Sequence, residues 1–451
     1  MPQCADGAVA SRHEVTRATG PIAYRACAGT LAIRQDGTEL ADLFYTAYLA
    51  EGGDADRPLA FIWNGGPGAD SALLHFGALG PMLLRDGRLV ENPVTPLGTA
   101  DLVFLDPAGT GFSRAASDEA ARMLYSTNGD IVATRLFVEA FLEAYGRTAS
   151  PIVLIGESFG TWRAAGTAEA LIDAGRPVAG LALISGGIPL GPDRDRAQVR
   201  ALSLTNRTAT ALALGRLAPD LQADPRAAMA QAAAFARQTW YPALSDLASL
   251  DPDRRAAVIA GLERYMGLPA AAIDPETLWV SPRQFREELL QDRGIVLDVF
   301  DMRRPTGTTG RRDDRAIVAY FRNRLGYKAG AYAGVEAEPI AVGAKWQYDQ
   351  SPITPESLAR AIAGEGPPSP SQPWILRAMR KDPHLRGYVA TGLYDSLNSC
   401  ENIAAVVAAL PDATGDRFTA QCYRGGHMMY EVPQEAIRFG NDVTAFIANA
   451  R

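Results

Sequence analysis

The sequence is poor in the residues that define several protein classes. Its 451 residues carry a formal net charge of -7 and include only four cysteines and four histidines. The cysteines are Cys4, Cys27, Cys400 and Cys422. They are too few and too scattered for a disulfide framework, and their spacing does not suit a metal site. We therefore expect four free thiols, although one pair could meet in the fold, and neither a metal nor a cofactor.

Long apolar runs and an excess of positive charge are also missing. No stretch approaches the ~20 apolar residues that span a bilayer, and the acidic balance argues against nucleic acid as a partner. The segment Met1–Ser11 has neither a basic start nor an apolar region, so we expect no secretory signal in this chain. These absences predict a protein without membrane or nucleic-acid partners. It would be cytoplasmic, or periplasmic or secreted if a leader has been removed.

One apolar run ends in a motif that carries chemistry. Ile152–Ile155 is continuously aliphatic, which is typical of a strand buried on both faces. It leads directly into Gly156–Gly160, which reads Gly-Glu-Ser-Phe-Gly, and an alanine-rich segment follows. A serine between small residues at a strand-to-helix turn is the nucleophile-elbow pattern of the α/β-hydrolases. The alternative is a glycine turn with an incidental serine, but the flanking strand and helix favour the elbow.

The other apolar runs predict a mostly parallel central sheet. Further strands are expected at Leu59–Trp63, Leu102–Leu105, Gly180–Ser185, Leu385–Gly392 and Phe418–Tyr423. Strands that alternate with helical patterns imply right-handed crossovers between parallel strands. Nearer the amino terminus, an Asp-Gly pair at Asp36 and Gly37 separates two apolar runs, which predicts a β-hairpin.

The composition changes between about Ile188 and Lys345, where alanine, arginine and leucine dominate and strand patterns vanish. Helical windows appear there at Asp224–Trp240, Arg283–Gln291 and Arg312–Arg324. We interpret this region as a helical insertion over the carboxyl ends of the strands. The expected fold class is therefore α/β: an α/β-hydrolase core formed by residues 1–187 and 346–451, with a helical cap insertion over residues 188–345.

A serine hydroxyl is a weak nucleophile and needs a general base, most often a histidine oriented by a carboxylate. His427 follows a predicted strand and two glycines, where a side chain can project over the carboxyl edge of the sheet. It is the candidate base, and a structural loop histidine is the alternative. His13 falls in a polar stretch that we expect to be irregular, and His384 precedes its strand, at the wrong edge of the sheet.

The orienting acid should follow another strand. Asp395 lies just past the predicted strand Leu385–Gly392, although an aspartate in a turn is the alternative interpretation. The chain order Ser158, Asp395, His427 is the order found in α/β-hydrolases.

The segment Asn64–Gly68, which reads Asn-Gly-Gly-Pro-Gly, follows another predicted strand. Glycines in this position expose backbone N–H groups that can stabilise a developing oxyanion. We assign the amides of Gly66 and Phe159 as the two donors of an oxyanion hole. The alternative for the loop is a tight strand-to-helix turn.

Four blocks of the sequence together suggest a family. They are Trp63–Gly68, Pro107–Ser113, Gly156–Gly160 and Gly425–Met428. In this order they resemble the signature blocks of the serine carboxypeptidase family, peptidase family S10. The resemblance runs, with gaps, over nearly the whole chain outside the helical insertion. It implies an α/β-hydrolase fold, a helical cap, and release of single carboxyl-terminal residues from peptides.

The resemblance also implies roles for further residues. Asn64 and Glu157 match the family residues that bind the terminal carboxylate of the substrate, and Met428 matches the residue that packs on the leaving amino acid. A carboxylate beside Glu157 must share a proton with it, so substrate binding should favour acidic pH. The alternative for Glu157 is an ordinary elbow residue directed to solvent.

Two residues depart from the family pattern. Ala78 stands where many members have a second glutamate that supports the carboxylate site, which leaves strict exopeptidase specificity open. Ala69 replaces the cysteine that commonly follows the Asn-Gly-Gly-Pro-Gly block, so that structural disulfide is missing. The second departure suits a bacterial-type, disulfide-poor member and a reducing compartment.

Three functions are compatible with these residues. The first is a serine carboxypeptidase that forms an acyl-enzyme on Ser158. The second is an acyltransferase, amidase or esterase of the same fold that acts on a small metabolite. The third is a non-catalytic scaffold, which the presence of nucleophile, base and acid disfavours. The partner is expected to be a peptide or a small acyl substrate, and a homodimer is one assembly that the sequence leaves open.

Overall fold

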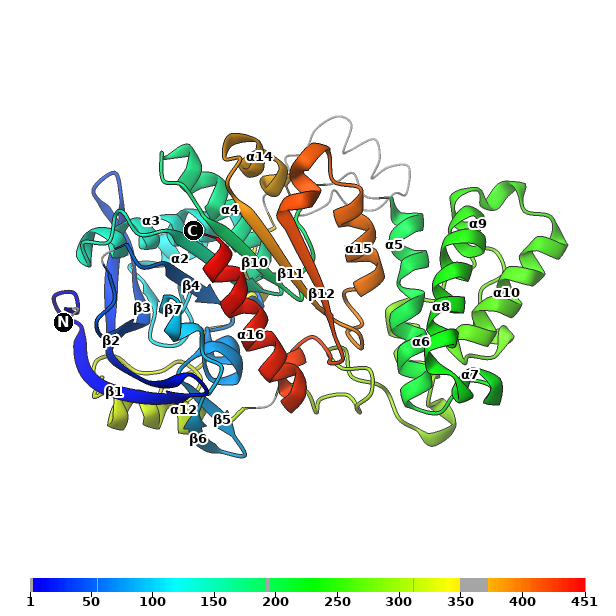
Figure 1. The fold of residues 1–451 in the computed structure, drawn as a ribbon, viewed down its shortest axis with the longest axis horizontal. Helices are drawn as coiled ribbons and strands as arrows, with labels where there is room; N and C mark the ends of the chain where they lie inside the picture. Colours follow the sequence, from blue (N-terminus) through cyan, green and yellow to red (C-terminus); the bar gives the residue numbers. More distant parts are fainter. Residues whose placement is uncertain (1–2, 55, 192–194, 311, 349–371, 451) are drawn as a thin grey trace. The chain divides into compact units, whose positions relative to one another are not determined.

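The computed structural model describes residues 3–54, 56–191, 195–310, 312–348 and 372–450. The chain divides into two compact units, each built from separate segments of the sequence (Figure 1). Unit 1 consists of Met1–Pro192, Arg312–Tyr388 and Ala436–Arg451, and unit 2 consists of Asp193–Arg311 and Val389–Glu435.

A twisted sheet forms the centre of unit 1. In the order in which they pair, its main strands are β1 (Val9–Arg17), β2 (Gly20–Gln35), β3 (Thr38–Ala50), β7 (Asp101–Leu105), β4 (Leu59–Trp63), β9 (Ile152–Glu157) and β10 (Gly180–Ile184). The first four pair antiparallel, and β7, β4, β9 and β10 pair in parallel. All residues of these four parallel strands are buried, as expected for apolar runs covered on both faces.

The hairpin predicted at Asp36 and Gly37 is confirmed. Both residues have positive φ angles, 50° and 80°, and Gln35 pairs with Thr38 across the turn. A two-residue type I′ hairpin turn requires a positive φ angle at both of its central residues. The expectation of an irregular segment around His13 was wrong, because this residue lies in β1 and pairs with Tyr24 of β2.

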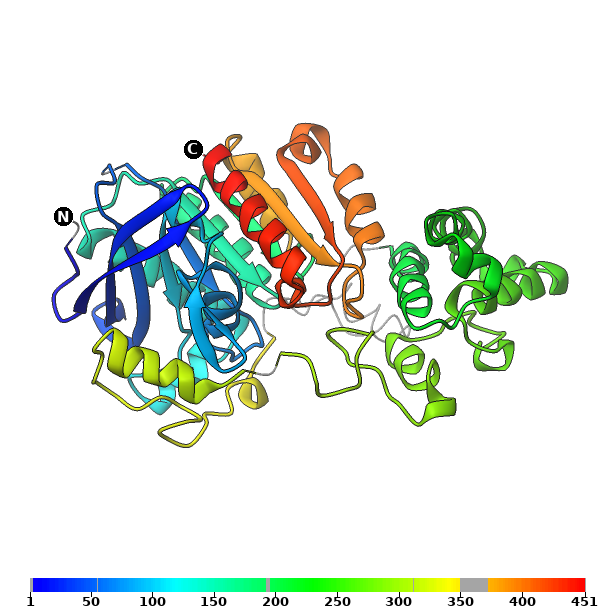
Figure 2. The same cartoon turned by 60° about the horizontal axis from the view of Figure 1, so that its bottom comes forward.

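Helices cover both faces of the sheet of unit 1. They are α1 (Ala72–Leu74), α2 (Asp118–Leu124), α3 (Thr127–Ala144), α4 (Gly160–Asp173), α12 (Asp314–Ala319), α14 (Trp374–Lys381) and most of α16 (Pro433–Asn449). A π-helical turn, η1 (His75–Leu79), follows α1. The short strands β5 (Met82–Arg85) and β6 (Arg88–Glu91) form a separate two-stranded sheet, and β8 (Arg114–Ala115) pairs with β3. Helices α3 and α4 lie on one face of the sheet and α16 crosses the other (Figures 1 and 2).

Unit 2 is largely helical. Its helices are α5 (Arg196–Leu202), α6 (Leu204–Ala213), α7 (Pro219–Ala223), α8 (Pro225–Phe235), α9 (Tyr241–Ser245), α10 (Pro252–Met266), α11 (Pro282–Glu288) and α15 (Cys400–Ala408). The helical windows predicted at Asp224 and at Arg283 coincide with α8 and α11. Strand β11 (Arg386–Gly392) begins in unit 1 and continues in unit 2, where β12 (Phe418–Tyr423) lies next to it.

The expectation of free thiols was wrong. Cys4 pairs with Cys27 in unit 1 and Cys400 pairs with Cys422 in unit 2, each pair with Cα atoms 5.5 Å apart. The partners are 23 and 22 residues apart in sequence. Their pairing therefore depends on the fold bringing two segments together, which no local sequence pattern predicts. The disulfide-poor interpretation therefore loses its basis. None of the helices in the described part of the chain combines the length and apolar character needed to cross a bilayer.

Candidate active site

Ser158 sits at a sharp turn between the buried strand β9 and helix α4 in unit 1. Its φ angle is +57°, a left-handed backbone conformation that is uncommon for residues other than glycine. The Ser158 amide donates to the carbonyl of Ile184 at 2.8 Å, and the Thr161 hydroxyl donates to the Ser158 carbonyl at 2.9 Å. The predicted strand-turn-helix is therefore present, with Ser158 half-buried at its corner.

The loop Asn64–Gly68 contacts this turn through backbone atoms. A Cβ atom on Gly65 would lie 2.5 Å from the Phe159 nitrogen and 2.7 Å from the Glu157 oxygen, and no real side chain fits at such distances. Gly66, the predicted oxyanion donor, has a φ angle of +102°. Glycine at 65 thus allows the loop that carries the Gly66 amide to lie directly against the turn that carries Ser158 and the Phe159 amide.

Asn64, at the start of the same loop, has a side-chain donor without an acceptor among the described residues. Its side chain is 1% exposed, and its Oδ1 atom accepts the Leu74 amide at 3.0 Å, which fixes the orientation of the amide group. The Nδ2 atom is buried and has no hydrogen-bond acceptor among the described residues. A buried donor without an acceptor costs roughly 1–3 kcal/mol, so this atom is a candidate to bind a ligand oxygen.

Arg163 of α4 is a residue that the sequence analysis missed. It is fully buried, and its Nε atom donates to Asp130 of α3 at 2.7 Å, while Nη1 donates to the Asn64 carbonyl at 2.6 Å. Burial raises the pKa of Asp130, and the charge of Arg163 opposes that rise. Arg163 therefore joins helices α3 and α4 to the start of the loop Asn64–Gly68, which we call the oxyanion loop. Its only signal in the sequence is an arginine within an alanine-rich helix.

Two acids are buried just beyond the oxyanion loop. The Ser71 amide and hydroxyl donate to Asp106 at 2.9 and 2.8 Å, whereas Arg312 and the Tyr332 hydroxyl donate to Asp70 at 2.8 and 2.5 Å. Burial raises the pKa of Asp106 to about 7, and the nearby charge of Asp70 adds to the rise. Asp106 therefore changes its charge near neutral pH, next to the Pro107–Ser113 block.

Glu157, predicted to bind a carboxylate, is the last residue of β9 and is 2% exposed. It is therefore not the solvent-directed residue of the alternative interpretation. Ala78, in the place of the second glutamate, is also buried, within η1. The Phe159 ring packs against aromatic neighbours, with ring centroids 5.3 Å from Trp162 and 5.1 Å from Trp346. An apolar surface thus adjoins the nucleophile.

The predicted acid and base are in contact in unit 2. The Nδ1 atom of His427 lies 2.9 Å from Oδ2 of Asp395, and both side chains are buried. Asp395 also accepts the Leu397 amide at 2.9 Å and the Asn398 side-chain amide at 3.0 Å. Because an ionised carboxylate can only accept, Nδ1 carries the proton and Nε2 is the nitrogen that can act as a base.

Asn206 of α6 holds the loop that carries Asp395. Its Nδ2 atom donates to the carbonyls of Gly392, Asp395 and Asn398, at 3.3, 3.0 and 2.7 Å. The disulfide between Cys400 and Cys422 adds a covalent link, since it joins the start of α15 to β12, the strand before His427. Neither contact was predicted from the sequence, because each joins separate elements of the fold.

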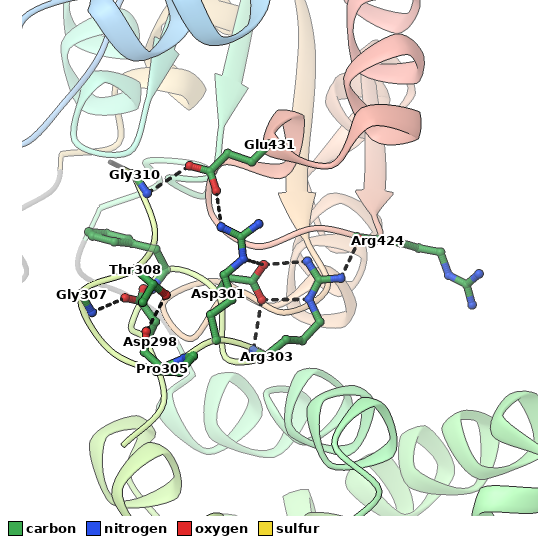
Figure 3. Close-up of polar contacts among 11 residues, drawn as sticks. Asp298, Asp301, Arg303, Pro305, Gly307, Thr308, Gly310, Arg424 and Glu431 are labelled. Atoms are coloured by element: carbon green, nitrogen blue, oxygen red, sulfur yellow. Dashed lines mark hydrogen bonds and ion pairs between the residues drawn. The ribbon is translucent and has the colours of Figure 1, made fainter. Parts of the chain in front are cut away.

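The loop that carries His427 rests on the segment after α11. The His427 amide donates to the Phe300 carbonyl at 2.6 Å, and the two rings lie with centroids 5.2 Å apart. A Cβ atom on Gly426 would be 2.3 Å from the Phe300 oxygen, so glycine is required for this approach. Met428, the predicted pocket residue, follows and is buried. Figure 3 shows polar contacts between the segment after α11 and two residues near His427, Arg424 and Glu431.

The other histidines have different surroundings. His75 is buried, its Nε2 atom is 2.7 Å from the Tyr48 hydroxyl, and its ring stacks on Phe104 at 4.0 Å. Burial holds the pKa of His75 well below its usual range, so the ring is a neutral core residue. His384 is exposed and precedes β11. Within the described ranges, no group of three or more histidine, cysteine or acidic side chains is placed to hold a metal ion.

The structure thus assembles the predicted residues in two groups. Ser158, Phe159, Gly66, Asn64 and Glu157 belong to unit 1, and Asp395, His427 and Met428 belong to unit 2. Joint action of the two groups as one catalytic site stays a prediction.

Comparison with known proteins finds similarity over the part of the chain that carries the first group. Residues 18–175 match the family model of serine carboxypeptidases, Peptidase_S10. Over these residues the chain is similar to serine carboxypeptidases. Three of the four signature blocks lie inside it, and Gly425–Met428 lies outside. The bacterial-type assignment stays a prediction.

Two curated relatives illustrate the extent of the similarity. Serine carboxypeptidase S10 family member 1 from Dictyostelium discoideum is 32% identical over 127 residues, which cover 27% of this chain and 30% of that protein. The pheromone-processing carboxypeptidase KEX1 from Saccharomyces cerevisiae is 34% identical over 140 residues, 28% of this chain and 19% of the relative. The aligned region thus spans less than a third of each relative.

The similarity of structure extends further than that of sequence. The crystal structure of KEX1 from Saccharomyces cerevisiae superimposes with a TM-score of 0.58 at 16% identity and covers 94% of this chain and 91% of the yeast chain. The predicted α/β-hydrolase fold, with its mostly parallel central sheet, is confirmed.

Proposed function

We propose that this protein is a serine carboxypeptidase that releases carboxyl-terminal residues from peptides through an acyl-enzyme on Ser158. The observation that carries the proposal is the buried Asn64 side-chain nitrogen, which has no acceptor in the described part of the chain. Asn64 begins the loop that packs against the Ser158 turn. An endopeptidase, which cleaves inside a polypeptide, does not need such a donor, whereas a carboxypeptidase must recognise the terminal carboxylate of its substrate.

In the proposed reaction, the Ser158 hydroxyl attacks the scissile carbonyl while His427 Nε2 takes its proton. Asp395 orients the imidazole through Nδ1 and stabilises its charged form. The amides of Gly66 and Phe159 donate to the oxyanion of the tetrahedral intermediate. His427 then protonates the leaving amine, and a water molecule, deprotonated by His427, releases the acyl group. The mechanism requires units 1 and 2 to bring the hydroxyl and the imidazole within hydrogen-bond reach.

The leaving residue would be recognised by its carboxylate. Asn64 Nδ2 would donate to one oxygen, and Glu157 would share a proton with the other, so that binding weakens as pH rises. Met428 would pack on the leaving side chain. On the acyl side, the apolar surface of Phe159, Trp162 and Trp346 favours a large apolar side chain next to the scissile bond.

A second function is an amidase, esterase or acyltransferase acting on a small metabolite. The observation in its favour is Ala78, which leaves Glu157 without the second carboxyl group that many members of the family have. A weaker carboxylate site would permit substrates that lack a free carboxyl terminus.

The decisive experiment compares N-blocked dipeptides with their C-terminal amides between pH 4 and pH 8. A carboxypeptidase should cleave the free acids much faster, with a preference that declines as pH rises. Ser158→Ala should abolish activity, and Asn64→Leu, which removes the donor but keeps the size, should raise KM for the free acid alone. Equal cleavage of acid and amide would support the second function. Full activity in Ser158→Ala would refute both.

We further propose that the protein works in an oxidising compartment, the periplasm or the cell exterior, rather than in the cytoplasm. Two disulfides support this location, because cytosolic thiols are kept reduced. Alkylation of the native protein, followed by mass spectrometry, should find no reactive thiol; modification of all four cysteines in protein taken from its own cells would contradict the proposal. A homodimer stays a prediction that light scattering can test.

A further inference from the structure

The segment Asp298–Gly310, which we call the clamp, lies between α11 and the part of the chain that returns to unit 1. It has no regular secondary structure, yet two of its acids are buried. Asp298 accepts the amides of Phe300 and Gly307, both at 2.8 Å, which closes the clamp into a compact loop. Burial raises the pKa of Asp298, but these hydrogen bonds outweigh burial and lower it overall.

The clamp contacts the loop that carries Asp395. The amide of Met302 donates to the Tyr394 carbonyl at 3.0 Å, and the Ser396 hydroxyl donates to the Val299 carbonyl at 2.7 Å. These contacts lie on the two sides of Asp395 in sequence. The clamp therefore restrains the loop that carries Asp395, which we call the acid loop, immediately before and after Asp395.

The clamp also contacts the loop that carries His427. The Phe300 carbonyl and ring hold the His427 amide and imidazole, as described above. Further along the loop, Glu431 accepts the Gly310 amide at 3.0 Å and pairs with Arg304 at 2.8 Å (Figure 3). The loop that carries His427, which we call the base loop, is thus held at His427 itself and again at Glu431.

Arg303 is the side chain that joins both loops. Its guanidinium group forms two hydrogen bonds with the buried carboxylate of Asp301, at 2.9 and 2.6 Å (Figure 3). It lies over the Tyr394 ring with its central carbon 4.1 Å from the ring centroid, and it donates to the Arg424 carbonyl at 3.4 Å. Tyr394 precedes Asp395, and Arg424 begins the turn that leads to His427.

We propose that Arg303 is a positioning residue that sets the contact between Asp395 and His427 by holding the acid loop and the base loop on the clamp. The proposal rests on the proposed function, in which that contact orients the base. The planar guanidinium suits this role, because it can pair with a carboxylate at its edge and stack on a ring with its face. A lysine offers neither geometry.

The test compares Arg303→Met with Arg264→Met. Arg264 is the matched control, because it also pairs with an acid, Asp220, and lies over a ring, that of Tyr265, but on α10 away from these loops. In dipeptide hydrolysis, Arg303→Met should lower kcat by up to about a hundredfold with little change in KM, since misplacing a catalytic group has effects of that size. Arg264→Met should match the wild-type protein.

The pH profile separates positioning from a general loss of stability. Weakening the hydrogen bond to Asp395 makes the charged imidazole less stable, so the acidic limb of kcat/KM should move to lower pH by about 1 unit. Arg303→Lys should show the same shift, because it keeps the charge but not the geometry. If Arg303→Met leaves Asp301 with only its longer ion pair to Arg304, at 3.8 Å, and prevents folding, the double variant Asp301→Asn/Arg303→Met should fold and show the same loss of kcat.

A spectroscopic measurement keeps the proposal testable if the function is different. In the wild-type protein, the His427 Nδ1 proton bonded to Asp395 should give a far-downfield NMR resonance, and Arg303→Met should shift or remove it. An unchanged resonance together with an unchanged pH profile would overturn the proposal. A wild-type protein without hydrolase activity would refute the proposed function, and the resonance would still decide the role of Arg303.

Discussion

Among the described residues, each unit contains one arginine that is almost completely buried, and the two arginines have different partners. In unit 1, Arg163 pairs with the buried carboxylate of Asp130 and donates to the Asn64 carbonyl. Its positive charge is compensated and connects elements of the proposed catalytic site. A buried ion of this kind is stable only while its partner is present.

In unit 2, Arg207 of α6 is 3% exposed and has no carboxylate partner among the described residues. Its guanidinium lies over Trp279 at 4.8 Å and Phe285 at 5.8 Å, and Nη1 contacts the Met266 sulfur at 3.8 Å. Burial lowers the pKa of Arg207 to about 9, so it is still charged at neutral pH. The comparison indicates that unit 1 uses buried charge to fix geometry, whereas unit 2 tolerates it within an aromatic core.

The largest effect is expected for Arg163→Met. The substitution leaves Asp130 buried without a counter-charge, which should destabilise the protein by about 3–5 kcal/mol. Urea denaturation measures the change. The double variant Arg163→Met/Asp130→Leu removes both charges and should regain most of the stability. A single variant as stable as the wild-type protein would show that the pair contributes little.

The next effect concerns Asp106, another buried acid of unit 1. The pKa of Asp106 in the folded protein, about 7, is above its value of about 3.9 in an unfolded chain, so folding favours the protonated form. Its contribution to stability is complete below about pH 4 and is lost as the pH rises through 7. Asp106→Asn keeps an acceptor for Ser71 and cannot ionise. It should therefore gain stability relative to wild type between pH 4 and pH 8, by at most about 4 kcal/mol. A constant difference across that range would contradict the assignment.

A smaller effect is expected for Arg207→Met in unit 2. The substitution loses the contact of a cation with two rings, worth about 0.5–2 kcal/mol, but removes a buried charge that lacks a partner. The net change in the free energy of unfolding should be within about 1 kcal/mol, and a small stabilisation would also agree with this prediction. A loss as large as that of Arg163→Met would remove the contrast between the units.

The smallest effect is expected for Arg264→Met. Both side chains of the Arg264–Asp220 pair are exposed, so solvent screens their attraction. Thermal unfolding should give the wild-type midpoint, and this result also qualifies the variant as the control for Arg303. A clear decrease in the midpoint would show that unit 2 depends on surface charge more than its buried arginine suggests.

The sequence was informative where the chemistry is local. The turn at Ser158 and the hairpin at Asp36 depend on residues that are neighbours in the chain, and both are present in the structure. The contact between Asp395 and His427 was expected only because parallel strands share an edge of the sheet. Motif spacing could therefore place the nucleophile and suggest its partners.

The residues that hold these groups in place were not predictable in the same way. Asn206 donates to the Asp395 carbonyl from 189 positions away, and Arg163 reaches Asn64 across 99 positions. Such contacts join segments that are distant in the sequence and meet only in the fold, which no short pattern encodes. The cysteine pairs also escaped prediction, although the partners are only 23 and 22 positions apart, because each partner lies on a different segment of the fold.

The closeness of Gly65 to the Ser158 turn has a consequence for protein engineering. Main-chain atoms meet main-chain atoms there, so no side chain exists whose replacement could retune the angle between the two segments. Libraries aimed at altered selectivity would do better to vary residues that surround this joint, such as Trp162 and Trp346, and to leave position 65 untouched.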